Sequence, residues 1–242
     1  MIRSWPPLSR LHLVAEPTGY RLLELVAVLD RLRSPGGCPW DARQTHESLI
    51  EYLIEETYET VEAIESGNSA HMREELGDLL LQVIFHARIA ADAADSFDID
   101  DVAVGIIAKL ISRHPHVFAD GQANTAAEVE ANWHRLKVAE KGRSSVTEGV
   151  PEALPALLRA AKLHARAASG GVSVVPASQP VLAVAEAAWD SVTAEAPDRT
   201  VALGDLLLVL ALAAKDEGID AEAALRAATR RYADRLKEAE LS

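Results

Sequence analysis

The sequence predicts an all-α protein built from amphipathic helices. Apolar residues recur three and four positions apart along nearly all of the 242 residues, and no run alternates apolar and polar residues as a strand would. Short segments rich in Gly, Pro, Ser and Asn separate these periodic stretches. Hydrophobic residues make up 49% of the chain, a share typical of a globular protein with a packed core.

The predicted helices are bounded by residues that end or begin helices. The segments "SPGGCPWD", "SGNS" and "RHPHVFADGQAN" follow the first, second and fourth helices. Thr125 and Glu128 have the spacing of a capping box at the start of the fifth. In chain order, the predicted helices span residues 19–33, 45–65, 70–94, 99–113, 125–141, 152–168, 180–195, 200–217 and 220–238.

Two low-complexity segments, "GRSSVTEGVPEALP" and "ASGGVSVVPASQP", separate an N-terminal half from a C-terminal half. The hexapeptide "LGDLLL" occurs in both halves, at 76–81 and at 203–208. A repeat of this kind on comparable apolar helices indicates an internal duplication, and chance in a leucine-rich sequence is the alternative. We therefore predict two helical domains, at 19–145 and 152–240.

The composition argues against several classes of partner. The formal net charge is −13, which opposes association with nucleic acid or anionic membranes, because both depend on clustered Lys and Arg. The longest apolar run, Leu206 to Ala214, is too short to cross a bilayer. The single cysteine, Cys38, suits a reducing compartment, and the first residues lack the apolar region of a signal peptide. We therefore expect a cytoplasmic protein.

Two successive predicted helices carry carboxylates at or beside their apolar faces. Glu56 and Glu59 lie three residues apart at the edge of one apolar face, so their side chains can converge. In the next helix Glu75 and Asp78 repeat this spacing on a face that is otherwise apolar. Burying an unpaired carboxylate costs several kcal/mol, so each must find a partner or a proton. The first of these faces is expected to consist of Leu53, Ile54, Thr57, Val61 and Ile64.

Two kinds of partner are available for these acids. Arg73 and Arg88 are near enough in sequence to form a buried salt-bridge network, which is a common fate of buried acids. However, four inward carboxylates exceed the nearby cations. Oxygen ligands without Cys or His at ligand spacing suit a hard cation such as Mg²⁺ or Mn²⁺. The pattern therefore favours a metal site.

Short motifs spread over roughly residues 20–170 match one known family in content and order. The segment "SPGGCPWDARQTHESLIEYLIEETYETVEAI" is followed by "EELGDLL", so that an EExxE motif precedes an ExxD motif. The runs "RHPHVF", "NWHRLKVAEK" and "GVPEALPALLRAAKL" come after them. In this order the sequence resembles the MazG nucleoside triphosphate pyrophosphohydrolases.

The resemblance implies an all-α, MazG-like helical bundle that assembles as a homodimer. It also implies Mg²⁺-dependent cleavage of nucleoside triphosphates between the α and β phosphates. The substrates are open between all NTPs and dNTPs and the damaged or non-canonical ones of a housecleaning role, and Mn²⁺ is expected as a substitute ion. Glu55 or Glu59 is the candidate base for the attacking water. The Mg²⁺ ligands that it implies are the four residues of the helical pattern, Glu56, Glu59, Glu75 and Asp78.

Basic and aromatic side chains are expected to contact the phosphates and the base of the nucleotide. Solvated lysines and packed tryptophans are the alternative for each of them. The candidates are Lys109 and Arg113 at the end of the fourth helix, Trp133, Lys137 and Lys141 on one stripe of the fifth, and Trp40 in "CPWD".

The second half is expected to be a degenerate, catalytically silent MazG-like domain. When the two "LGDLLL" segments are aligned, alanines stand opposite Glu56 and Glu75, and at most Glu186 and Asp205 remain of the ligand set. Two ligands rarely hold Mg²⁺ at a protein site.

Two other functions are compatible with a helical protein rich in glutamate. A ferritin-like dimetal oxidoreductase uses Glu-x-x-His motifs, and no glutamate of this chain has a histidine three residues later. A non-catalytic nucleotide-binding or scaffolding protein would suit the degenerate second half. The complete acidic set in the first half favours the enzyme.

Overall fold

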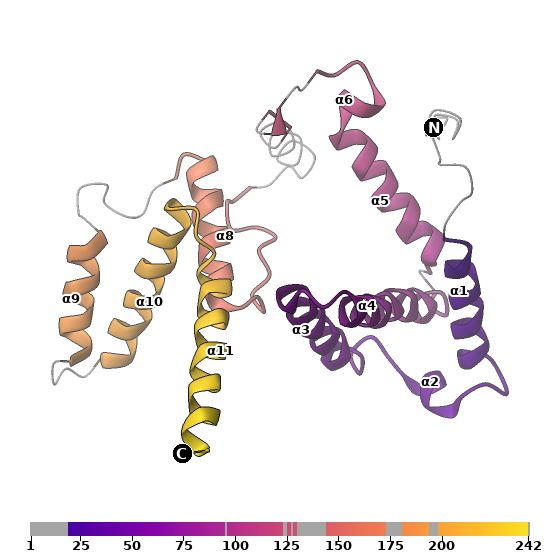
Figure 1. Ribbon diagram of the computed structural model, residues 1–242. Helices are drawn as coiled ribbons and strands as arrows, with labels where there is room; N and C mark the ends of the chain where they lie inside the picture. The colour runs from indigo at the N-terminus through magenta and orange to yellow at the C-terminus, as the bar shows by residue number, and fades with distance from the viewer. Residues whose placement is uncertain are drawn as a thin grey trace. The chain divides into compact units, whose positions relative to one another are not determined.

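In the computed structural model every regular element of the described residues is a helix, so the all-α prediction is confirmed (Figure 1). The described residues are 19–94, 96–122, 125–126, 128–129, 144–172, 181–193 and 198–241. The chain forms two compact units that meet in sequence between Trp133 and His134, earlier than the predicted domain end at residue 145. The predicted helix at 125–141 lies almost entirely outside the described residues.

An antiparallel pair of helices, α3 and α4, is the centre of the first unit. Helix α1 packs on α4 and on the short α2, and α5 contacts α4 and α6. Within the described residues, no helix is long and apolar enough to cross a membrane. The helices of this unit are α1 (Tyr20–Arg33), α2 (Pro39–Arg43), α3 (Ile50–Ser66), α4 (Ser69–Ala90), α5 (Ile99–Arg113) and α6 (Pro115–Phe118).

Local hydrogen bonds shift several helix ends from their predicted positions. Helix α3 begins at Ile50 instead of residue 45, because Thr45 and Ser48 bond each other's main-chain N–H groups in a separate turn, at 3.0 and 3.2 Å. Helix α4 ends at Ala90 instead of residue 94. The prediction did not include α2 and α6, which begin at prolines, residues that favour the first position of a helix.

The turn between α3 and α4 fixes how the two helices meet. Gly67 ends α3 with φ at 69°, a left-handed conformation that glycine adopts without strain. Asn68 then caps α4, since its side-chain oxygen accepts hydrogen bonds from the N–H groups of Ala70 and His71. A two-residue connection of this kind holds the helices side by side and antiparallel.

The core of the first unit lies mainly between α1, α4 and the segment before α3. Its fully buried members are Leu29, Leu49, Ile84 and Phe85. On α3, by contrast, Thr60 and Ala63 are the buried residues, and they face α4. The predicted apolar face is therefore wrong for Ile54 and Ile64, which are 51% and 57% exposed, because α4 covers only one side of α3.

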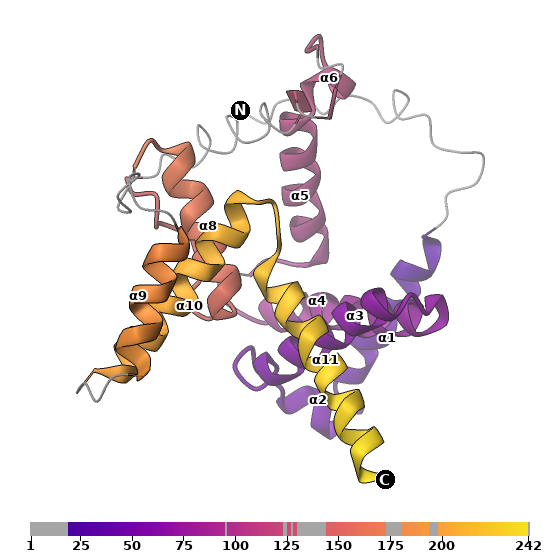
Figure 2. The ribbon, with the colours of Figure 1, turned by 60° about the vertical axis from the view of Figure 1, so that its left-hand side comes forward.

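The second unit is also helical, and α10 is its central helix. Helix α10 packs against α9, α8 and α11 (Figure 2). The two "LGDLLL" segments lie on α4 and α10, each of which pairs with the helix before it in the chain, whereas the duplication itself stays a prediction. Helix α8 begins at Ala156 instead of residue 152, because Pro155 disfavours helical geometry in the residue before it. The helices are α8 (Ala156–Ser169), α9 (Val181–Thr193), α10 (Arg199–Asp216) and α11 (Ala221–Glu240).

Two histidines join the segment before α3 to α4. The Nδ1 atoms of His46 and His86 lie 2.8 Å apart, and the two rings are stacked with an angle of 1° between their planes. One nitrogen must donate and the other accept, so the bond requires one neutral imidazole. Burial, and to a smaller extent the charge of His46, lowers the pKa of His86.

This pair predicts a loss of stability in mild acid. Because the folded pKa of His86 lies below its ordinary value of 6.5, folding disfavours the protonated ring, and the stabilisation present above pH 6.5 is lost as the pH falls through the folded pKa. Circular dichroism can follow thermal unfolding at both pH values. When the pH is lowered from 7.5 to 5.5, the Tm should fall less for His86→Phe than for the parent. Equal losses would contradict this role of the pair.

Candidate metal centre

Three carboxylates meet where α3 lies against α4. Glu56 of α3 and Glu75 and Asp78 of α4 each place one carboxylate oxygen within 4.8 Å of the others. The hydroxyl of Thr60 donates a hydrogen bond to the main-chain oxygen of Glu75 at 3.3 Å and joins the two helices at the same level. The arrangement brings together three of the four acids that the sequence pattern singled out.

Glu75 is the most buried member of the cluster. The residue is 7% exposed, and its Oε1 lies 3.0 Å from Nε2 of His71. Its other oxygen, Oε2, is buried and has no hydrogen-bond partner. Leaving a buried acceptor unsatisfied costs about 1–3 kcal/mol or more when it is charged, and a cation bound by Oε2 would remove this cost. The residues present therefore fit a hard divalent cation.

The electrostatic environment of Glu56 also favours a bound cation. Partial burial raises the pKa of Glu56, and the negative charges around it raise that pKa further. A divalent cation at this point would reverse the effect, because it favours the ionised carboxylate. The charges responsible, in order of decreasing effect, are those of Asp78, Glu59, Glu75 and Glu55.

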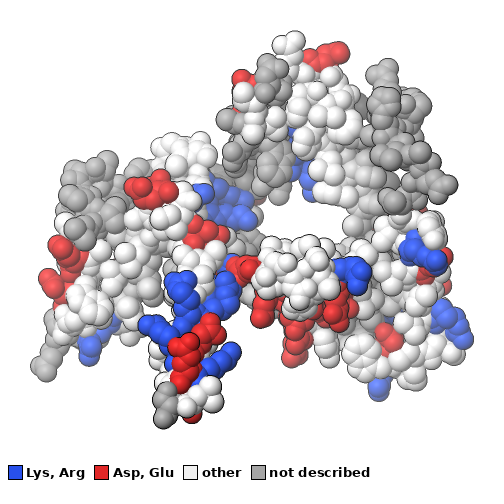
Figure 3. All heavy atoms as spheres, in the orientation of Figure 1, with Lys and Arg blue, Asp and Glu red and all other residues white. Residues whose placement is uncertain are grey.

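Glu55 and Glu59 lie on the outer side of this cluster. Both are exposed, and neither belongs to the group of three converging carboxylates. Glu59 is nevertheless near enough for its charge to raise the pKa of Glu56. Figure 3 shows acidic side chains gathered along α3. An ion held by the inner three carboxylates would therefore face further acids toward solvent.

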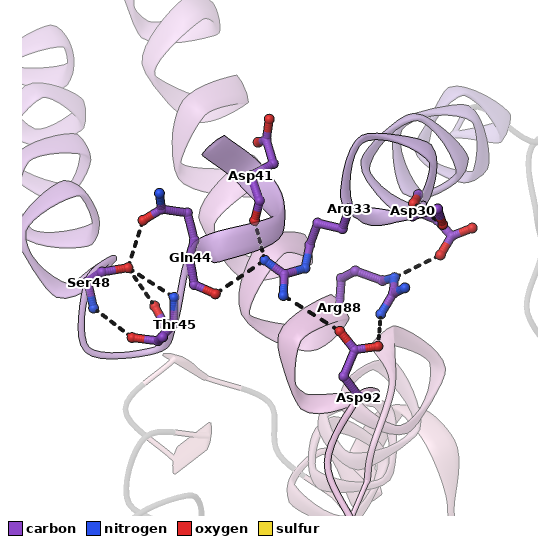
Figure 4. A network of polar contacts seen from close by, with 9 residues as sticks. Asp30, Arg33, Asp41, Gln44, Thr45, Ser48, Arg88 and Asp92 are labelled. Atoms are coloured by element: carbon purple, nitrogen blue, oxygen red, sulfur yellow. Dashed lines mark hydrogen bonds and ion pairs between the residues drawn. The ribbon is translucent and has the colours of Figure 1, made fainter. Parts of the chain in front are cut away.

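The structure places the two arginines of the salt-bridge alternative elsewhere. Arg88 donates to Asp30 at 2.7 Å and also to Asp92 (Figure 4), and Arg73 is exposed. Among the described residues, no Lys or Arg nitrogen lies within 4.0 Å of a carboxylate oxygen of Glu56, Glu75 or Asp78. Arg73 and Arg88 therefore do not form the expected salt-bridge network with these three acids, and the basic side chain beside Glu75 is His71.

Arg33 fixes the segment that carries Trp40. Its side chain is 7% exposed and donates to the main-chain oxygens of Asp41 and Gln44, while its guanidinium lies 3.6 Å from Asp92 (Figure 4). Trp40 itself is 46% exposed, and its ring meets the ring of Tyr52 edge-on, with centroids 6.1 Å apart. Tyr52 lies on α3 one turn before Glu56, so the two side chains share a face of that helix.

The residues predicted to bind the phosphates differ in their exposure to solvent. Lys109 of α5 is exposed, whereas Arg113 at the end of the same helix is 6% exposed and already has a partner. The burial of Arg113 favours an internal contact over contact with phosphate. The remaining candidates, Trp133, Lys137 and Lys141, lie outside the described residues.

Two residues of the site were not predicted from the sequence. His71 and Tyr52 each lie one helical turn before an acid of the cluster, Glu75 and Glu56 respectively. The four-residue spacing was the available signal, since it places side chains on the same helix face.

The crowded charges predict that the cluster destabilises the protein when no metal is bound. Replacing Asp78 by asparagine removes the charge that has the largest effect on the Glu56 pKa. Asp78→Asn should therefore be more stable than the parent in EDTA at pH 7.5. Solvent screening limits the gain in unfolding free energy to about 1 kcal/mol. Urea unfolding measures it, with the exposed Glu62→Gln as a control that should change little. A less stable Asp78→Asn protein would contradict the account.

Comparison with known proteins identifies the family. The model of the MazG nucleotide pyrophosphohydrolase domain matches residues 44–118. The nucleoside triphosphate pyrophosphohydrolase/pyrophosphatase MazG of Thermotoga maritima is 40% identical over 220 residues, which are 90% of this chain and 84% of that protein. An uncharacterised 26.1 kDa protein of Streptomyces cacaoi is 49% identical over 224 residues, 92% of this chain and 84% of its own length.

Among solved structures, a mazG-related protein from Thermotoga maritima is similar over 48% of this chain and 96% of its own, with 29% identity and a TM-score of 0.40. The family itself is shown by the sequence matches, because the 40% identity to the Thermotoga MazG protein extends over most of both chains. This chain belongs to the MazG family.

Proposed function

We propose that this protein is a Mg²⁺-dependent nucleoside triphosphate pyrophosphohydrolase. It converts a (d)NTP to the (d)NMP and pyrophosphate by cleaving the bond between the α and β phosphates. The observation that carries the proposal is the unpartnered, buried Oε2 of Glu75 within a cluster of three carboxylates. The name of the Thermotoga relative supports the same reaction.

Charge alone requires a cation between this site and its substrate. A triphosphate and several carboxylates are both strongly anionic, so they repel each other unless a divalent ion lies between them. Glu56, Glu75 and Asp78 would hold this ion, with Glu59 as a fourth ligand from the outer side. Bound Mg²⁺ supplies charge neutralisation at the phosphates and a water of lowered pKa. Mn²⁺ suits the same oxygen ligands.

The other residues of the site bind and orient. Glu55 or Glu59, exposed beside the cluster, would accept the proton of the attacking water. Trp40 would stack on the base, since its ring is accessible and supported by Tyr52. The cations proposed to contact the β and γ phosphates are Lys109, Lys137 and Lys141, and Trp133 is a second ring proposed to contact the base.

We further propose that the protein acts as a homodimer in the cytoplasm, and that removal of non-canonical nucleotides is one of its roles. Several large apolar residues of α3 and α4 support the dimer, because this unit leaves them uncovered. They include Ile54, Ile64, Leu76 and Val83, each at least 42% exposed.

The second unit is proposed to be catalytically silent. Asp205, one of its two retained acids, is exposed on α10, and the described part of this unit contains no comparable group of three metal-binding side chains. A non-catalytic nucleotide-binding protein remains the second candidate, because this unit would suit such a role.

The proposal predicts different effects for two acidic residues. Glu75→Gln should lower the rate of pyrophosphate release from NTPs by more than about 100-fold, since removing even an outer partner of a metal ligand costs about 10- to 100-fold. Asp205→Ala, a change at the position of the second unit that aligns with Asp78, should leave the rate nearly unchanged. A panel of canonical and damaged triphosphates assayed with Mg²⁺, Mn²⁺ and EDTA provides the measurement. Equal losses in both variants, or nucleotide binding without pyrophosphate release, would contradict a single catalytic site.

A further inference from the structure

We infer that His71 is a positioning residue that orients the Glu75 carboxylate for metal binding. The inference rests on the proposed metal site and assigns a role to a side chain that is not itself an oxygen ligand. Its basis is the different environment of the two carboxylate oxygens of Glu75.

The helix cap fixes the backbone of His71. The residue lies in the first turn of α4, where its N–H donates to the Asn68 side chain at 3.2 Å. Its ring then reaches along the helix to Glu75, four residues later, with Nε2 3.0 Å from Oε1. The capped first turn therefore fixes the backbone position from which the histidine acts.

The contact with His71 distinguishes the two carboxylate oxygens of Glu75. Oε1 lies 3.0 Å from Nε2 of His71, whereas Oε2 is buried without a partner. The main-chain oxygen of Glu75 accepts from Thr60 of α3, so the residue is anchored at both its backbone and its carboxylate. A carboxylate held at one oxygen cannot rotate freely, and it therefore presents the other oxygen in a fixed direction.

Such orientation matters for the ion proposed here. Mg²⁺ requires near-ideal octahedral geometry, so a ligand that is free to rotate binds it less well. Hydrogen bonds to metal ligands from neighbouring side chains are a general means of fixing ligand geometry, and their loss typically weakens metal binding about 10- to 100-fold. His71, whose Nε2 lies 3.0 Å from Oε1, is the side chain placed to hold Glu75 in this way.

The second unit offers a matched control. His164 of α8 contacts Asp216 of α10, with Nε2 2.7 Å from Oδ1, so it also forms a histidine–carboxylate contact. This pair is separate from the candidate metal site, which consists of Glu56, Glu75 and Asp78. Removal of this histidine therefore tests the general effect of losing such a pair.

The experiment measures Mn²⁺ binding to the full chain by isothermal titration calorimetry without nucleotide. His71→Leu should weaken the affinity about 10-fold or more, while His164→Leu should leave it unchanged. His71→Gln should retain most of the affinity, because its amide can still donate to an acid four residues later. Circular dichroism checks that each variant is folded.

The outcomes separate this inference from the proposed function. If Glu75→Gln loses Mn²⁺ binding but folded His71→Leu binds as the parent does, the metal site stands and the role of His71 is overturned. If His71→Gln is as weak as His71→Leu, donation of a hydrogen bond is not the property that matters, and the inference is again overturned. Unchanged binding by Glu75→Gln would overturn the metal site together with the inference that rests on it.

Discussion

The close approach of three carboxylates across the α3–α4 pair is the constraint on which the account of this protein depends. Their oxygens lie within 4.8 Å of one another, and no described Lys or Arg side chain neutralises them. Like charges at this separation oppose folding, and burial together with these charges raises the pKa of Glu56. A divalent cation would convert the repulsion into attraction, so the same feature that weakens the metal-free protein would provide its binding site.

The rest of the first unit holds this pair in register. Gly67 and Asn68 make the short connection that sets α3 against α4, and Thr60 links the two helices at Glu75. Arg33 ties α1 and α4 to the segment that carries Trp40. Rigid elements therefore position both the acids and the aromatic ring, an arrangement that favours a preorganised site.

Sequence periodicity was sufficient to predict the longer described helices and to single out the three converging acids. Glu75 and Asp78 lie on a helix that is apolar almost all round, where an acid must find a partner. Their spacing therefore indicated a binding site. Periodicity could not show which sides of α3 its neighbours cover, and Ile54 and Ile64 are exposed for that reason. Nor could it separate Glu56 from Glu59, since one turn of a helix carries both.

Local polar contacts were the other features that the pattern could not reveal. The start of α3 depends on a reciprocal bond between Thr45 and Ser48, and the orientation of Glu75 depends on His71. Each contact involves one particular side-chain geometry, which a rule based on residue spacing does not contain. The family resemblance added the expected chemistry, and the structure adds the physical reason for a cation at this position.

The most direct test of the central claim is a crystal structure of the protein grown with Mn²⁺, with data recorded at the manganese absorption edge. The account predicts an anomalous peak at about 2.0–2.3 Å from carboxylate oxygens of Glu56, Glu75 and Asp78, with Oε2 of Glu75 among the ligands. A structure in which these three carboxylates bind no ion at saturating Mn²⁺, or pair with basic side chains instead, would contradict it.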